Sequence, residues 1–217
     1  MKIKAFTLTE LLIALAVVGV LVAILLPVIL NLLPDQNALM AKRAYYTVQT
    51  ITSNLLNDDA CYPPKEHAQS ADMRGGLDDG YGYADCKMWG GKYNEGSITT
   101  ENANSKFITL FRNKLDASNE PSSETTFTTK DGIKWTAQNM QLAHSNSKPS
   151  IEFMIDVNGD DAPNCKSKTD NTNCSKKKEF DRFTVKIDAN GGLTIVEDWA
   201  KNAVGINADI TGADKNP

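Results

Sequence analysis

The strongest constraint on this chain is a run of twenty consecutive residues, from Leu11 to Leu30, without a charged or hydrogen-bonding side chain. A helix of that length spans about 30 Å, the thickness of the hydrocarbon core of a bilayer. A secretory signal peptide fits less well, because its apolar stretch has only about 7 to 15 residues before a small-residue cleavage site. The run therefore predicts a single membrane-spanning helix.

The rest of the chain has the opposite composition. Of the 42 Ile, Leu and Val residues in the 217-residue sequence, 19 lie in the first 33 positions and only 23 in the 184 that follow. With Phe added, the second part still falls below the roughly 20% at which an unaided core becomes doubtful. We therefore expect an apolar segment joined to a polar domain that needs further support.

Charged residues beside the apolar run predict its orientation and point to assembly. Lys2 and Lys4 are the only basic residues upstream, so the positive-inside rule places the N-terminus in the cytoplasm and the residues after Leu33 outside. Glu10 lies at the edge of the run, where a carboxylate is costly and needs a partner. The sequence has no Lys or Arg between Lys4 and Lys42, so we expect that partner to be another molecule or a free amine.

The segment 4–12 (KAFTLTELL), followed by the apolar run, resembles the processing site of type IV pilins and of the pseudopilins of type II secretion systems. The resemblance implies that a prepilin peptidase cuts between Ala5 and Phe6, methylates the new N-terminus and leaves the apolar helix in place. Ala5 stands where the family usually has glycine. Pro27 lies where many members have a proline that softens the helix.

The same resemblance implies how the chain is divided and what it does. Residues 1–5 form a leader, residues 6–33 a transmembrane and assembly helix in the lipid bilayer, and residues 34–217 a periplasmic or extracellular head. The new amine of Phe6 can pair with Glu10 of a neighbouring subunit, which relieves the desolvation cost of both charges. The apolar helix can leave lipid for the centre of a filament, since both surroundings are dry.

The implied function is that of a structural subunit, a pilin or pseudopilin, which polymerises from the inner membrane. The product is a type II secretion pseudopilus or a type IV pilus-like filament, in the periplasm or at the cell surface. Its expected partners are further copies of itself, other pilins or pseudopilins, the prepilin peptidase and the inner-membrane assembly platform.

The expected fold is α+β and pilin-like: a long N-terminal helix, transmembrane in its first half and amphipathic in its second, packed on an antiparallel sheet. Within the head we expect an amphipathic helix over 34–57, a loop-rich region over 58–125 with a short helix at 104–115, and a C-terminal tail over 200–217. The sheet is expected over 126–199 with four or five strands. The strand segments are 126–129, 133–137, 151–157, 183–188 and 193–196.

Four cysteines in a domain outside the cytoplasm predict disulfide bonds. Three pairings are possible. The sequence-local pairs Cys61–Cys86 and Cys165–Cys174 are favoured, because each closes a loop poor in apolar residues, and each bridge would contribute about 3 kcal/mol. A zinc site is disfavoured, since no CxxC spacing exists.

The loop 156–164 (DVNGDDAPN) is a candidate calcium site. It follows a strand and gathers oxygen ligands around Gly159, as calcium requires. It resembles a loop of many pseudopilin heads, with Asp-x-Asn-Gly, then Pro-Asn, and a later Asp before the next strand. The ligands that this resemblance implies are Asp156, Asn158, Asp160 and Asp181. The alternative is an Asx-rich turn whose side chains bind only the loop's own backbone.

No catalytic constellation is recognisable, so the sequence does not indicate an enzyme. His67 and His144 lack a Ser or Cys partner at motif spacing, and phosphate-binding glycine motifs are missing. Cleavage removes Lys2 and Lys4 and leaves 21 basic and 27 acidic side chains, a net charge of −6 that disfavours nucleic acid. The alternative to a filament subunit is a membrane-anchored, calcium-dependent binding or adhesive head that does not polymerise.

Overall fold

The computed structural model describes residues 8–32, 35–64, 76–80, 82–83, 85–86, 102–115, 125–142, 148–170, 174 and 180–206. It divides into two units, Met1–Asp35 and Gln36–Pro217, and the second is called the head below. The first unit contains the helix α1 (Leu8–Leu32). The helices of the head are α2 (Gln36–Leu56), α3 (Asn102–Lys114) and α4 (Asp198–Val204). Its strands are β1 (Thr126–Thr128), β2 (Lys134–Gln141), β3 (Ser150–Asp156), β4 (Arg182–Asp188) and β5 (Leu193–Ile195).

The five strands form one antiparallel sheet in the order β1-β2-β3-β4-β5, so each strand pairs with its neighbour in the chain. Alternation along β3 directs Ile151, Phe153 and Ile155 into the core, while Glu152 and Met154 are only partly buried. The α+β fold expected from the sequence is confirmed, with the upper of the two expected strand numbers.

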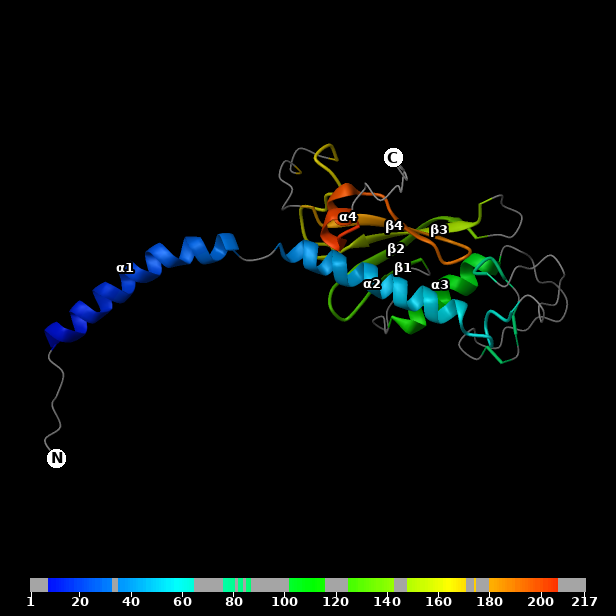
Figure 1. Ribbon diagram of the computed structural model, residues 1–217, viewed down its shortest axis with the longest axis horizontal. Helices are drawn as coiled ribbons and strands as arrows, with labels where there is room; N and C mark the ends of the chain where they lie inside the picture. Colours follow the sequence, from blue (N-terminus) through cyan, green and yellow to red (C-terminus); the bar gives the residue numbers. More distant parts are fainter. Residues whose placement is uncertain are drawn as a thin grey trace, which may run out of the picture. The chain divides into compact units, whose positions relative to one another are not determined.

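α2 supplies part of the helical side of the core, to which α3 and α4 also contribute (Figure 1). Its buried residues recur every three or four positions, which gives the helix one apolar stripe. The stripe consists of Ala41, Ala44, Tyr45, Val48, Ile51, Thr52 and Leu55. The amphipathic helix expected over 34–57 is therefore present as Gln36–Leu56, and it packs in the same core as the sheet.

Aromatic rings fill much of the core that the aliphatic residues leave open. Phe107 and Phe111 of α3 meet Phe153 of β3, and the rings of Phe111 and Phe153 stack with their centroids 4.6 Å apart. Trp135 of β2 packs edge-on against Phe111 at 5.9 Å, and Phe127 of β1 against Phe153 at 6.2 Å. Such rings bury large areas each, so a head poor in Leu, Ile and Val still has a packed interior.

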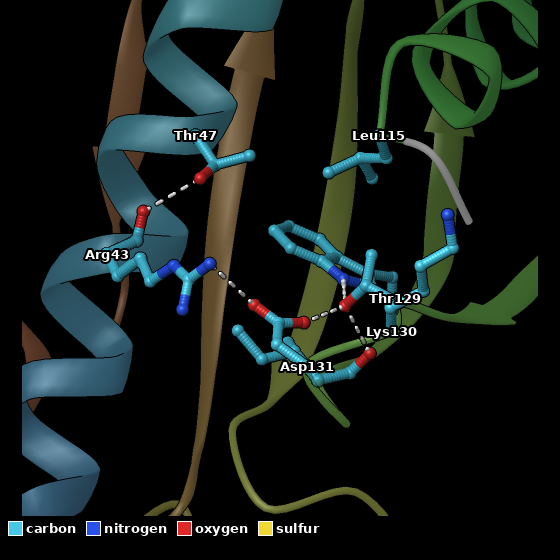
Figure 2. A pocket seen from close by; sticks show the side chains of 8 residues that line it. Arg43, Thr47, Leu115, Thr129, Lys130 and Asp131 are labelled. Atoms are coloured by element: carbon cyan, nitrogen blue, oxygen red, sulfur yellow. Dashed lines mark hydrogen bonds and ion pairs between the residues drawn. The ribbon is translucent and has the colours of Figure 1, made fainter. Parts of the chain in front are cut away.

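A turn between β1 and β2 ties the sheet to α2 (Figure 2). Arg43 of α2 forms an ion pair with Asp131 at 3.5 Å, and the Thr129 hydroxyl donates to Asp131 at 2.5 Å. The indole Nε1 of Trp135 donates to Thr129 Oγ1 at 3.3 Å. These residues line a cavity of about 230 Å³ between the helix and the turn.

The structure differs from the expected boundaries at the C-terminal end. The sequence predicts a tail over 200–217, but residues up to Val204 belong to α4, whose Ala200 and Val204 are buried. Gly205 ends the helix in the left-handed region, with φ of +86°, and its N–H donates to the carbonyl oxygens of Lys201 and Asn202. A seven-residue helix is too short for a periodic pattern to reveal. The sheet correspondingly ends at Ile195 instead of residue 199.

Candidate functional site

The structure pairs Cys61 with Cys86 and Cys165 with Cys174, and all four cysteines are buried. Of the three possible connectivities, this is the sequence-local one that the loop compositions favour. The second bridge begins directly after the candidate calcium loop.

That loop leaves β3 at Asp156. After the loop, the backbone of Cys165 forms an isolated β-bridge with that of Phe180, just before β4. Gly159 turns the chain with a φ of +76°. A Cβ at this position would lie 2.9 Å from the Gly132 carbonyl oxygen, so both the dihedral and the close approach require glycine.

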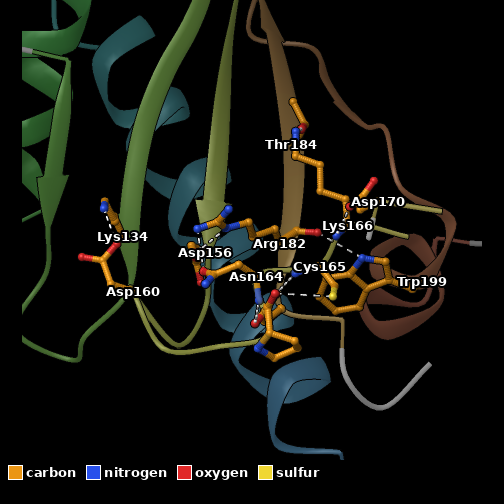
Figure 3. Close-up of polar contacts among 12 residues, drawn as sticks. Lys134, Asp156, Asp160, Asn164, Cys165, Lys166, Asp170, Arg182, Thr184 and Trp199 are labelled. Atoms are coloured by element: carbon orange, nitrogen blue, oxygen red, sulfur yellow. Dashed lines mark hydrogen bonds and ion pairs between the residues drawn. The ribbon is translucent and has the colours of Figure 1, made fainter. Parts of the chain in front are cut away.

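Asp156 lies at the end of β3, and its side chain is buried. Its Oδ2 accepts a hydrogen bond from Nε of Arg182 at 2.5 Å (Figure 3). Burial raises the pKa of the Asp156 carboxyl group, and the Arg182 hydrogen bond and charge offset only part of that rise.

The other two predicted carboxylate ligands are used elsewhere. Asp181 is fully buried and accepts the backbone N–H groups of Asn164 at 2.8 Å and Cys165 at 2.5 Å. Asp160 pairs with Lys134 of β2, and its side chain is 79% exposed. Asp181 therefore holds the end of the loop, whereas Asp160 points to solvent beside β2.

Two buried oxygens of the predicted set, Asp156 Oδ1 and Asn158 Oδ1, have no hydrogen-bond partner. Calcium takes about six to eight oxygens, and the four predicted side chains do not converge to supply them. Within the part of the chain that the structure describes, no group of three or more His, Cys, Asp or Glu side chains is placed to hold a metal ion. The residues present therefore do not fit the expected calcium ligand set, and calcium binding stays a prediction.

Sequence reasoning missed Arg182, the residue that joins the two ends of this loop. Its Nη2 donates to Asn164 Oδ1 at 2.5 Å, and its carbonyl oxygen accepts the indole N–H of Trp199 at 3.2 Å. The sequence places Arg182 directly before the predicted strand 183–188, but the register that brings it opposite Asp156 comes from the structure.

Another cation, Lys106 of α3, was also missed. Its side chain is fully buried, with Nζ 4.2 Å from the ring centroid of Tyr62 and 5.0 Å from that of Tyr83. Burial lowers the pKa of Lys106 to about 8, although the negative charges of Asp79 and Asp58 raise this pKa in part. The signal was a lysine on the apolar stripe of α3, next to Phe107.

α1 is the remaining candidate, and its chemistry differs from that of the head. Glu10 lies in its first turn, Pro27 lies within its backbone range, and the cleavage residues Ala5 and Phe6 lie outside the described residues. The side chains from Leu8 to Leu26 are all exposed. Among the described residues, this is the one helix long and apolar enough to cross a membrane.

Comparison with known proteins bears on this N-terminal segment. Residues 1–26 match the family model of the prokaryotic N-terminal methylation motif. Neither a curated protein nor a solved structure matches the chain. The motif points to a structural family, and together with α1 it fits a protein anchored in the inner membrane. The chain thus carries at its N-terminus the prepilin cleavage motif of type IV pilins and pseudopilins.

Proposed function

We propose that this protein is a pilin or pseudopilin that polymerises from the inner membrane into a type IV pilus-like filament or a type II secretion pseudopilus. The observation that carries the proposal is the N-terminal methylation motif, whose match over residues 1–26 includes most of α1 and its apolar run from Leu11. An enzyme would need converging catalytic groups, whereas a filament subunit needs an apolar helix that packs against other subunits and a stable head.

In this proposal the prepilin peptidase cleaves between Ala5 and Phe6 on the cytoplasmic side. The freed amine of Phe6 then pairs with the Glu10 carboxylate of a neighbouring subunit, and this contact sets the axial register of the packed helices. Because α1 is apolar on every side, it is as stable among other apolar helices as in lipid. The protein is thus stored in the membrane and moves into the filament with its head outside.

The two disulfide bonds support the outward placement of the head. Disulfides persist in oxidising compartments such as the periplasm and the cell surface and are rare in the cytosol. Lys2 and Lys4 favour the same orientation.

The test is Glu10→Ala in the full-length protein, expressed in cells that contain the prepilin peptidase and the assembly platform. We expect the variant to insert into the membrane and to be cleaved, with a mature N-terminus at Phe6 measured by mass spectrometry. Incorporation into sheared filaments, measured by immunoblotting, should fall at least about tenfold, because the amine and carboxylate no longer neutralise each other.

Asp35→Ala is the matched control, since it removes a carboxylate at the other end of the apolar segment. It should assemble like the unaltered protein. Normal assembly of Glu10→Ala would contradict the proposed role of Glu10. A chain that is cleaved but never enters any filament would favour the anchored, non-polymerising head.

A further inference from the structure

We infer that the Arg182 guanidinium is the resident cation of the loop after β3, and that this loop closes in the unaltered protein without calcium. The inference is independent of filament assembly. It rests on how the side chains of the loop are already used and on where Arg182 lies.

Arg182 joins the beginning of the loop to its end. As the first residue of β4 it pairs in register with Asp156, the last residue of β3. Its Nε binds Asp156 Oδ2 and its Nη2 binds Asn164 Oδ1, both at 2.5 Å. One planar group therefore contacts the residue before the turn and the residue after it (Figure 3). This is the linking task that a metal ion performs in a loop closed by coordination.

The other two predicted carboxylate ligands, Asp181 and Asp160, already have partners in the structure. Both oxygens of Asp181 accept backbone N–H groups, which holds Asn164 and Cys165 in place. Asp160 has Lys134 as its counter-ion and faces solvent. Of the loop carboxylates, Asp156 alone is buried and directed at a side-chain cation, and that cation is Arg182.

The two unpartnered oxygens, Asp156 Oδ1 and Asn158 Oδ1, fall well short of a calcium shell. A divalent ion bound to the Asp156 carboxylate would also lie within a few ångströms of the guanidinium and be repelled by it. Calcium could enter only if Arg182 moved away and gave up both of its hydrogen bonds. Arginine suits the position because its fork geometry is fixed and its charge does not titrate in the physiological range.

The first experiment measures thermal unfolding of the full-length chain in detergent by tryptophan fluorescence. Trp199 is the local probe, since its indole binds the Arg182 carbonyl group. We expect the same Tm in EGTA and in millimolar calcium. A calcium site occupied at about one hundred times its Kd would instead raise Tm by roughly 5 to 10 °C, and a rise of that size, reversed by EGTA, would overturn the inference.

The second experiment removes the cation. Arg182→Gln should lower Tm by several degrees in EGTA, because a buried carboxylate loses its partner. Arg43→Gln is the matched control, because Arg43 also pairs with an aspartate but is 65% exposed, and it should change Tm by no more than about one degree. An Arg182→Gln variant as stable as the unaltered protein would contradict the inference.

Arg182→Lys covers the case in which Arg182→Gln does not fold. It keeps the charge but cannot contact Asp156 and Asn164 in the same bidentate geometry, so its Tm should lie below that of the unaltered protein and remain insensitive to calcium. An Arg182→Lys variant as stable as the unaltered protein would show that the guanidinium contacts with Asp156 and Asn164 do not close the loop.

Discussion

Two regions of the head each combine a disulfide bond with a largely buried cation, Arg182 of β4 in one and Lys106 of α3 in the other, but they hold that cation in different ways. The Arg182 cluster, made of Arg182, Asp156 and Asn164, lies beside Cys165–Cys174 and joins its members by hydrogen bonds. The Lys106 cluster, made of Lys106, Tyr62 and Tyr83, lies beside Cys61–Cys86, since Tyr62 follows Cys61 in the chain. There the Lys106 ammonium faces aromatic rings and makes no hydrogen bond.

The difference shows that the two cations stabilise the head for different reasons. A guanidinium binds through directed N–H groups, so the Arg182 cluster depends on charge and geometry. An ammonium over a ring is attracted without strict direction, and its long alkyl stem packs like an apolar side chain. The Lys106 cluster should therefore depend more on volume than on charge.

The largest effect is expected from removing the disulfide bonds, which both clusters share. Replacing Cys61 and Cys86 by Ala opens a 25-residue separation and should cost about 3.5 kcal/mol, whereas the 9-residue separation of Cys165 and Cys174 should cost about 2.7 kcal/mol. The measurement is urea unfolding of the full chain in detergent. A greater loss for the shorter loop would mean that contacts of the Arg182 cluster, not chain entropy, govern that bridge.

A smaller effect is expected from Asp156→Asn, which keeps the shape of the side chain but removes the counter-charge of Arg182. We expect a loss of about 2 kcal/mol in the free energy of unfolding, because both groups are largely buried. Asp160→Asn removes the exposed partner of Lys134 and should cost less than about 0.5 kcal/mol. Equal losses for the two variants would remove the distinction between the buried and the exposed pair.

In the Lys106 cluster, the neutral variant should be tolerated. Lys106→Met keeps most of the buried volume and removes an ammonium that has no hydrogen bond, so stability should change by at most about 1 kcal/mol in either direction. Lys106→Ala leaves a cavity beside Tyr62 and should cost about 2 kcal/mol. If Met were as damaging as Ala, charge would matter here as it does around Arg182.

The smallest effect is a dependence on pH that belongs to Lys106. Its pKa falls from 10.5 to about 8 on folding, so the folded chain releases the proton first as pH rises. The free energy of unfolding, compared with that of Lys106→Met, should therefore increase by less than about 1 kcal/mol between about pH 7 and pH 8.5. A decrease between about pH 7 and pH 8.5 would show that folding favours the protonated form of Lys106.

Tyr62 acts outside this pH range. Burial raises the pKa of Tyr62, which destabilises the fold only above about pH 10.

The elements of the fold were predictable where the pattern is local. The stripe from Ala41 to Leu55 predicted α2, and the strongly apolar segment from Ile151 to Val157 predicted β3. The α4 helix was missed, because two buried residues over seven positions carry little periodic signal. β2 extends beyond residue 137 to Gln141, past an irregularity in the register near Asn139, whose φ is +46°. Such a deviation depends on the pairing with β3 and leaves no sequence signature.

The candidate loop was recognised from the sequence, but the contacts of its carboxylates with other residues were not. Asp156 and Asp181 resemble calcium ligands when read along the chain, because both are acidic residues at strand ends. In the fold, one binds Arg182 and the other caps backbone N–H groups. A ligand prediction from spacing omits the cations that neighbouring strands bring to the same place.

The sequence by itself determined the processing motif, the apolar α1, the α+β character of the head and the preference for sequence-local disulfides. Each of these follows from residues close together in the chain. Only the tertiary structure decided which charges meet. Arg182 reaches Asp156 across 26 positions, and Lys106 meets Tyr62 across 44. Those contacts exist because strand register and loop closure bring distant residues together, and burial then makes each pairing matter.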